Sequence, residues 1–366
     1  MRVIVTGGAG FIGSALVRHL VLERGAEAVL VVDKLTYAGD RRSLRDCEGR
    51  PGFAFLQADI CDLDRMRAAM AEFRPDAVMH LAAESHVDRS IAGAAPFVET
   101  NVRGTFALLE AARGHHAGLG AEARGRFRFL HVSTDEVFGS LGEGDRAFDE
   151  RTPYDPRSPY SASKAASDHL ARAWRETYGL PAIVTNCSNN YGPFHFPEKL
   201  IPLTILNALE GRELPVYGDG GNLRDWLYVE DHVRALVAAV ERGVPGETYC
   251  VGGRSEMRNL EVVRAVCDLL DERRPAARRR RELVRFVPDR PGHDRRYAID
   301  PSKIERELGW RARESFASGI ARTVDWYLAN EWWWRPLRER VYGGERLGLL
   351  PEPAAAPAAA PASAAP

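Results

Sequence analysis

The 366-residue chain lacks the cysteine pattern of a disulfide framework or a zinc cluster. Its five cysteines, at positions 47, 61, 187, 250 and 267, are odd in number and scattered, and no Cys-x-x-Cys motif occurs. This usage is typical of a reduced protein in the cytoplasm. The histidines at 80, 86, 131 and 115–116 lack the spacing of metal ligands, so we expect them to be packed or solvated and predict no metal site.

The sequence also lacks a long apolar run and an excess of charge of one sign. No stretch approaches the ~18 apolar residues of a membrane-spanning helix, and the first residues enter a strand pattern directly, so we expect no signal peptide. Lys and Arg number 50 against 51 Asp and Glu, which leaves no basic surplus for nucleic acid. The length allows about two domains. We therefore expect a soluble cytoplasmic protein, and neither a nucleic-acid nor a membrane partner.

The first forty residues contain the pattern of a nucleotide-binding turn. An apolar run at 2–6 is followed by GGAGFIG at 7–13 and a helical pattern at 14–24, and a second apolar run ends in Asp33. A G-x-G-x-x-G between strand and helix, with an acid about 20 residues on, is typical of dinucleotide sites. The glycines let the pyrophosphate approach the helix N-terminus. Asp33 can accept ribose hydroxyls and would repel a 2′-phosphate, which favours NAD over NADP, although Lys34 weakens that preference slightly.

Short apolar runs then alternate with helical patterns. Strands are predicted at 53–57, 77–81 and 182–188, and helices at 63–73, 96–112 and 160–178. Such alternation predicts parallel βαβ units in an α/β fold, a Rossmann-type doubly wound sheet. After residue 188 the alternation loosens, which predicts a smaller mixed α/β substrate-binding domain, although 248–251 could return as one more strand of the sheet.

A predicted strand at 127–132 ends in a polar cluster. Thr134, Asp135 and Glu136 follow it, at the edge of the sheet where ligands bind in open α/β folds. A hydroxyl and two carboxylic acids there could orient a substrate, donate a proton and accept one. Neighbours in a continuing strand point to opposite faces, so both acids can reach one substrate only if the strand has ended. The alternative is that they are ordinary polar residues of a loop.

Tyr160 and Lys164 are spaced to share one face of the helix predicted at 160–178. A lysine ammonium near a phenol favours the phenolate, so we expect a lowered pKa for Tyr160 and a role as a base. The spacing alone is common, but its place after a nucleotide-binding turn and a strand ending in Ser-Thr gives it weight.

Together these features resemble the extended short-chain dehydrogenase/reductase family, and more narrowly the dTDP-glucose 4,6-dehydratases within it. The stretches that carry the narrower resemblance are DKLTYAG (33–39), LAAESHVDRS (81–90), TDEVFG (134–139), HFPEKLIP (195–202), RDWLYVEDH (224–232) and DRPGHDRRY (289–297). The resemblance covers about residues 1–330. Phe138 stands where the family usually has tyrosine, so a phenolic hydroxyl there cannot be essential.

The resemblance implies a reaction on dTDP-glucose with bound NAD. C4 is oxidised with Tyr160 as base, supported by Thr134 and Lys164. Glu136 then removes the C5 proton and Asp135 protonates the leaving C6 hydroxyl. Hydride finally returns from NADH to C6 and a proton to C5, which gives dTDP-4-dehydro-6-deoxy-glucose. This chemistry needs one acid ionised while its neighbour is protonated, so their environments must separate the two pKa values.

The resemblance also implies the binding residues, none of which is a metal ligand. Those for the cofactor are Gly7, Gly10, Phe11, Ile12, Gly13, Asp33, Lys34, Leu35, Thr36, Asp59, Ile60, Leu81, Ala82, Ala83, Ser85, Thr100, Tyr160, Lys164 and Asn190. Those for the substrate are Ser85, Thr134, Asn189, Lys199, Leu200, Pro215, Val216, Tyr217, Arg224, Asn259, Asp289, Arg290 and His293. An arginine can pair with a diphosphate, and a tyrosine offers a face for a pyrimidine.

Three alternatives remain open. One is a 4-epimerase or a UDP-glucuronate decarboxylase of the same superfamily, and the acid pair speaks against the epimerase. A dehydratase acting on another nucleotide sugar would share that pair. A non-catalytic NAD-sensing or scaffold protein would have kept the fold, and loss of Tyr160, Lys164 or an acid would mark it, yet all are present.

We predict an NAD-binding domain at 1–188, with a later contribution from about 226–252, and a nucleotide-sugar-binding domain mainly at 189–345. Residues 351–366 are almost only Ala and Pro, a composition that favours a disordered tail. By resemblance we expect a homodimer formed through the helices near 96–112 and 160–178.

Overall fold

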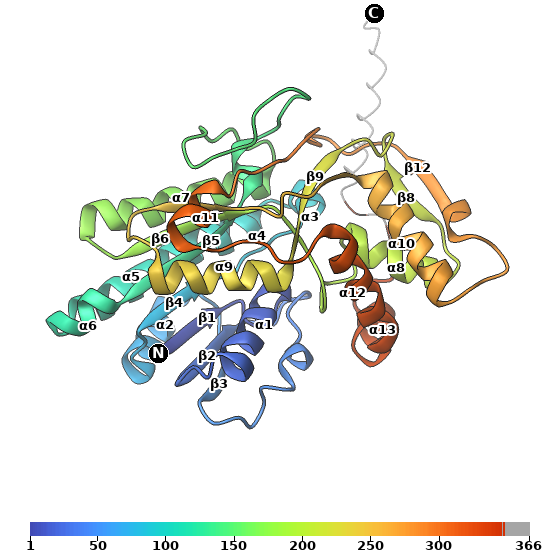
Figure 1. Cartoon of the computed structure of the whole chain (residues 1–366). Helices are drawn as coiled ribbons and strands as arrows, with labels where there is room; N and C mark the ends of the chain where they lie inside the picture. Colours follow the sequence, from blue (N-terminus) through green and yellow to red (C-terminus); the bar gives the residue numbers. More distant parts are fainter. Residues whose placement is uncertain (346, 348–366) are drawn as a thin grey trace, which may run out of the picture.

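The computed structural model describes residues 1–345 and 347, so the predicted Ala/Pro tail lies outside the described residues. Two groups of elements are visible along the chain (Figure 1). A large sheet with helices on both faces takes up most of the first 250 residues, and two small sheets with four helices follow it.

The large sheet has seven parallel strands in the order β10-β6-β5-β4-β1-β2-β3. Their apolar, valine-rich sequences suit buried strands, and only the edge strand β3 is partly exposed along its length. The strands are β1 (Arg2–Thr6), β2 (Ala28–Asp33), β3 (Phe53–Gln57), β4 (Ala77–His80), β5 (Arg128–Thr134), β6 (Ala182–Cys187) and β10 (Thr248–Val251). The order reverses between β1 and β4, as in a doubly wound sheet, so the predicted Rossmann-type fold is confirmed.

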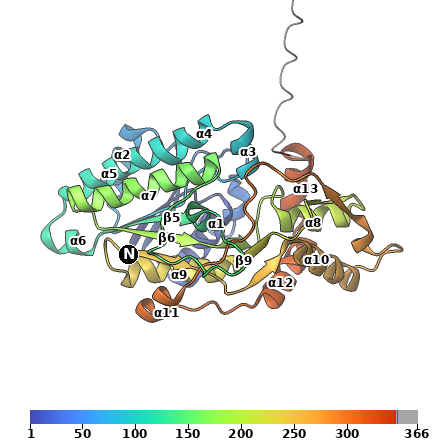
Figure 2. The same cartoon turned by 90° about the horizontal axis from the view of Figure 1, so that it is seen from above.

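Alternate side chains along the strands point to opposite faces of the sheet and pack in separate hydrophobic cores. Val3 and Val5 of β1 pack in one cluster with the helices α1 (Phe11–Arg18), α9 (Val229–Arg242) and α11 (Ser302–Leu308). Ile4 packs in the other cluster with α2 (Leu63–Phe73) and α5 (Thr105–Ala117), beside which lies α7 (Pro159–Tyr178) (Figure 2). This two-sided cover holds the carboxyl ends of the strands at one edge.

Several predicted boundaries differ from the structure. The strand predicted to end at 132 continues to Thr134, and the predicted helix 96–112 runs from α4 (Ala95–Phe97) through a π-helical segment, Val98–Gly104, into α5. The sequence also predicts one helix from His195 to about Leu209, but the helix begins only at Leu200, as α8 (Leu200–Leu209). The short helices α3 (Val87–Ala92) and α6 (Ala121–Arg126) complete this part of the chain.

The remaining elements form a smaller mixed α/β group. Its strands are β7 (Asn189–Tyr191), β8 (Leu214–Tyr217), β9 (Leu223–Tyr228), β11 (Glu256–Arg258) and β12 (Val284–Val287), in sheets β11-β9-β7 and β12-β8. They share an aromatic-rich core with α8, α10 (Asn259–Arg273), α12 (Phe316–Ala329) and α13 (Glu331–Arg340). The stretch 302–310 packs back against the first core beside β10. The division into two domains stays a prediction.

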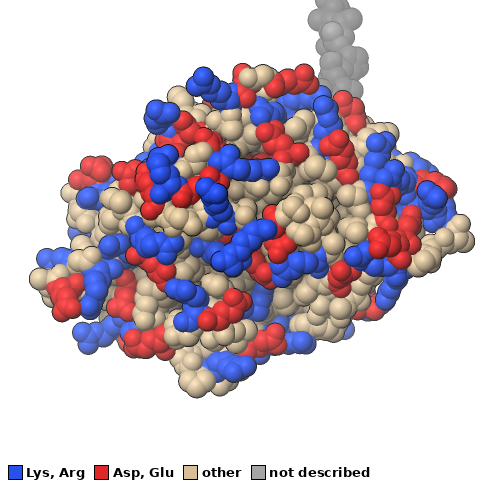
Figure 3. Space-filling model, viewed as in Figure 1, with Lys and Arg blue, Asp and Glu red and all other residues tan. Residues whose placement is uncertain are grey.

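The described surface gives two further facts. Basic and acidic side chains are interspersed over the face viewed in Figure 3, as the balanced composition leads one to expect. Within the described residues, every helix is too short or too polar to cross a lipid bilayer.

Candidate active site

One pocket lies at the carboxyl edge of the large sheet and extends over the smaller group of elements. It brings together nearly all of the predicted site residues. From the cofactor set it is lined by Gly7, Gly10, Phe11, Ile12, Gly13, Asp33, Lys34, Thr36, Ile60, Leu81, Ala82, Ala83, Ser85, Thr100, Tyr160, Lys164 and Asn190. From the substrate and catalytic sets it is lined by Thr134, Asp135, Glu136, Asn189, Lys199, Leu200, Pro215, Val216, Tyr217, Arg224, Asn259, Arg290 and His293.

Three predicted residues do not line this pocket, and each contacts a neighbour that does. Leu35 has a left-handed backbone, φ 59°, and its N–H donates to Asp33 Oδ1 at 2.8 Å. Asp59 accepts from Lys34 Nζ at 3.4 Å, and Asp289 accepts from His293 Nδ1 at 2.6 Å.

The glycine turn at the start of α1 forms a close-packed cradle. A Cβ on Gly13 would lie 2.1 Å from the carbonyl oxygen of Gly7, and one on Gly7 would lie 2.6 Å from the amide nitrogen of Ala82. Gly10 is the N-cap of α1, and no side chain caps the helix there. The free N–H groups of this helix end can therefore receive an anion.

Asp33 lies at the end of β2 beside this turn. Its Oδ2 accepts from the N–H of Ala9 at 3.0 Å, in addition to the bond from Leu35. Burial raises the pKa of Asp33, while the two backbone N–H groups lower it. Lys34 is engaged elsewhere, because its Nζ also donates to Thr100 Oγ1 at 3.1 Å.

The polar cluster at 134–136 has the geometry that the two acids require. Strand β5 ends at Thr134, and a 3-10 turn, Asp135–Phe138, follows directly. The Thr134 hydroxyl caps this turn: it accepts from the N–H of Glu136 at 3.2 Å and donates to Asp135 Oδ1 at 3.3 Å. Gly139 ends the turn with φ 88°. Because the strand has ended, both acids line one pocket.

The two carboxyl groups have different electrostatic surroundings. Burial raises the pKa of Asp135 well above its usual value, and the charges of Glu136 and Asp225 add to that effect. Burial also raises the pKa of Glu136, but the cations of Arg290, Lys199 and Arg224 oppose the shift. The environment thus makes Asp135 the more readily protonated of the two acids.

Tyr160 and Lys164 share one face of α7, as their spacing predicts, but the expected lowering of the phenol pKa is not found. Burial, followed by the charge of Glu136, raises the pKa of Tyr160 well above its usual value, and the Thr134 hydroxyl opposes this through a hydrogen bond. The Lys164 ammonium instead donates to the carbonyl of Val132 at 2.8 Å. The prediction was wrong for this state because burial and the charge of Glu136 act in the same direction, and the Lys164 ammonium is bound to the Val132 carbonyl.

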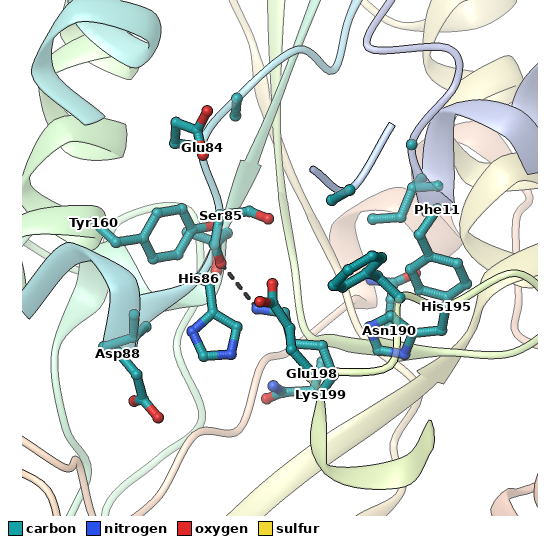
Figure 4. Close-up of a pocket in the computed structure, with 18 of the residues that line it drawn as sticks. Phe11, Glu84, Ser85, His86, Asp88, Tyr160, Asn190, His195, Glu198 and Lys199 are labelled. Atoms are coloured by element: carbon teal, nitrogen blue, oxygen red, sulfur yellow. Dashed lines mark hydrogen bonds between the residues drawn. The ribbon is translucent and has the colours of Figure 1, made fainter. Parts of the chain in front are cut away.

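Several polar residues of the pocket were not predicted as site residues, among them Glu84 and four others that are labelled in Figure 4. The His195 ring stacks on Phe11 with centroids 4.1 Å apart. Glu198 is buried and accepts from Tyr37 and Arg89, at 3.0 and 2.7 Å. His86 and Asp88 lie in the loop and helix after β4.

A signal for these residues was present in the sequence. His195 and Glu198 stand in the quoted stretch 195–202, and the other three stand in 81–90. The resemblance assigns these residues no binding role. Lys199, a predicted substrate residue, donates to the carbonyl of Ser85 at 3.0 Å across the pocket (Figure 4). Among the described residues no group of three or more His, Cys, Asp or Glu is arranged to hold a metal.

Comparisons with known proteins point to one kind of enzyme. The sequence matches the model of the GDP-mannose 4,6-dehydratase family over residues 4–323. It is 63% identical, over 350 residues, to a probable dTDP-glucose 4,6-dehydratase of Sinorhizobium fredii. The matched region covers 96% of this chain and 99% of the relative.

Among solved structures, the fold resembles dTDP-glucose 4,6-dehydratase of Streptomyces venezuelae, crystallised with NAD, at a TM-score of 0.85 and 48% identity over 92% of this chain and all of that one. It also resembles UDP-glucose 4-epimerase of Thermus thermophilus, in complex with NAD, at a TM-score of 0.79 and 33% identity over 90% of this chain and all of that one.

Proposed function

The chain belongs to the dTDP-glucose 4,6-dehydratase family, and we propose that it converts dTDP-glucose to dTDP-4-dehydro-6-deoxy-glucose with NAD as cofactor. The observation that carries the proposal is the placement of Asp135 and Glu136 in the same pocket as Tyr160 and Lys164. Oxidation and reduction at one carbon need only a base such as Tyr160. Elimination of water needs a second base and an acid, and the pocket holds both.

The cofactor fits the residues at the carboxyl ends of β1 and β2. The cradle of Gly7, Gly10 and Gly13 leaves no room for side chains and exposes the N-terminus of α1, which suits a pyrophosphate. Asp33 would accept the hydroxyls of the adjoining ribose. When bound, NAD supplies a hydride acceptor for C4, the returning hydride for C6 and a positive charge in the pocket.

The acid and the bases have separate roles in this proposal. Tyr160 accepts the proton of the 4-hydroxyl, with the hydroxyl of Thr134 supporting it. Glu136 takes the proton from C5, and the cations of Arg290, Lys199 and Arg224 favour the ionised form that this step needs. Asp135 gives its proton to the departing 6-hydroxyl, since burial keeps it protonated. The opposed surroundings of two adjacent carboxyl groups thus allow both steps at one pH.

The nucleotide part of the substrate would lie against the smaller group of elements. Arg224, Arg290 and Lys199 bring three cations to the pocket, which suits a diphosphate. Tyr217, at the end of β8, would present its ring to the pyrimidine.

The test is turnover of dTDP-glucose in heavy water, followed by mass spectrometry and NMR. We expect loss of one water, deuterium at C5 and no net formation of NADH. Unchanged substrate, or an epimer of unchanged mass, would exclude the dehydratase. Parallel reactions with UDP-, CDP- and GDP-glucose decide whether another nucleotide sugar is the substrate.

A Glu136→Gln variant extends the same experiment. The amide keeps the size of the side chain but cannot take the C5 proton, so product formation should fall by roughly a hundredfold or more. Oxidation at C4 should still occur, and one equivalent of bound NADH should accumulate. Product at the normal rate would show that Glu136 is not the base.

We also propose that the protein is a cytoplasmic homodimer. Val98, Phe106 and Tyr178 are 56%, 42% and 50% exposed, and all three lie on or beside the α5 and α7 pair. Phe106 and Tyr178 both contact the ring of Trp174, at 5.7 and 5.3 Å, so they form one apolar surface. A second copy of the chain would cover it. Five free thiols fit a reducing compartment, where NAD and nucleotide sugars are available.

A further inference from the structure

Asp88 is a buried carboxylate of the pocket to which the proposed reaction assigns no role. It lies in α3, next to the large sheet, and is 4% exposed. It is also the point at which three segments meet, because Tyr217 of β8 and Arg290 of the loop before residue 297 both contact it.

Each oxygen of the Asp88 carboxylate serves one partner. Oδ1 accepts from Arg290 Nη1 at 2.5 Å, and Oδ2 accepts from the Tyr217 hydroxyl at 3.0 Å. The ring of Tyr217 in turn meets the ring of His293 edge to face, with centroids 6.1 Å apart. One carboxylate therefore fixes both Tyr217, which would contact the pyrimidine, and Arg290, which would contact the diphosphate.

Burial makes this arrangement specific. A carboxylate removed from water needs hydrogen-bonded or charged partners, and a paired arginine is held in one orientation by the bond. The Nε of Arg290 is buried and has no hydrogen-bond partner among the described residues. Because buried polar atoms are rarely left unpaired, the guanidinium retains a donor that a phosphate oxygen could use.

We propose that Asp88 is a positioning residue, which holds Tyr217 and Arg290 in the arrangement that binds the nucleoside diphosphate part of the substrate. This inference rests on the proposed function. Asp88 acts through the two side chains and does not touch the reacting carbons. Its loss should therefore weaken binding of the nucleotide and leave the chemical steps in place.

The test compares Asp88→Asn and Asp88→Ala with wild type, using dTDP-glucose for turnover and dTDP alone for calorimetric binding. Asn keeps one acceptor without the charge, and Ala keeps none. We expect KM and the Kd for dTDP to rise by roughly tenfold or more, further for Ala than for Asn, while kcat changes less than about twofold and the NAD content is unchanged. Asp64→Asn, which breaks an exposed pair with Arg67 on α2, is the matched control and should change neither constant.

A double variant distinguishes positioning from general damage. If Asp88 acts through Tyr217, the effects of Asp88→Asn and Tyr217→Phe on the Kd for dTDP will not add. Unchanged KM and Kd in Asp88→Asn, or a fall in kcat and NAD content with KM unchanged, would overturn the inference. The Asn variant keeps the shape of the side chain, so it serves if Ala does not fold. Failure of the wild type to convert dTDP-glucose would instead refute the proposed function, and dTDP binding would still test Asp88.

Discussion

Asp135 is only 1% exposed and lies beside a second acid, Glu136. This burial should make the free energy of unfolding depend on pH. Its pKa in the folded protein is raised well above the ordinary value, mainly by burial. Folding therefore favours the protonated form. The favourable contribution is fully present below the unfolded pKa of about 4 and is lost as the pH rises through the folded pKa.

Replacing Asp135 by Asn should make the protein more stable at pH values above the folded pKa of Asp135. The same change should abolish the dehydratase activity. The amide stays neutral at every pH, so the difference in Tm between variant and wild type should grow from acid toward alkaline pH, by a few degrees in all. Thermal unfolding between about pH 4 and pH 9 measures it. A difference that is constant over this range, or larger in acid, would contradict the raised pKa of Asp135.

Among the elements, the turn before α1 offers the sharpest test of the cofactor site. Gly13→Ala would place a methyl group 2.1 Å from the Gly7 carbonyl oxygen, so the turn must open. We expect at least roughly tenfold weaker NAD binding and a stability loss of about 1–3 kcal/mol. Fluorescence titration with NADH and chemical denaturation measure the two effects.

Gly125→Ala in helix α6 is the control for this change. A Cβ at Gly125 meets nothing within 4 Å, and alanine is the better helix former, so this variant should bind NAD normally and be as stable or slightly more stable. Normal NAD affinity in Gly13→Ala would mean that the turn does not form the pyrophosphate site.

The elements that the sequence predicted best are those whose signal is local. The bounds of β1 and α2 agree with the predicted 2–6 and 63–73, because apolar periodicity and the Asp62 cap lie within the segment itself. The errors fall where distant contacts decide. Ser133 and Thr134 look like a loop, yet they pair with Asn186 and Cys187 of β6 and stay in the strand. The segment before α8 is not helical, and His195 in it stacks on Phe11.

In the candidate site, too, local sequence signals could be read in advance and contacts between distant residues could not. The resemblance to a family supplied most of the pocket, but the residues alone did not show which groups meet. Asp88 lies 129 positions from Tyr217 and 202 from Arg290, and nothing local marks the contact between them. The pKa of Tyr160 was also beyond reach, because it depends on burial and on Glu136 more than on the neighbour four positions on.

The assembly of the whole molecule can be tested at one exposed ring. Phe106 is 42% exposed and packs edge to face on Trp174, on the surface proposed to meet a second copy. Phe106→Asp would place a charge in that contact, and burying an unpaired charge costs several kcal/mol. We expect light scattering to give the mass of a dimer for wild type and of a monomer for the variant at micromolar concentration. Phe286 of β12 is 60% exposed and lies outside the α5 and α7 surface, so Phe286→Asp should remain a dimer. A monomeric wild type, or a dimeric Phe106→Asp variant, would place the interface elsewhere or remove it.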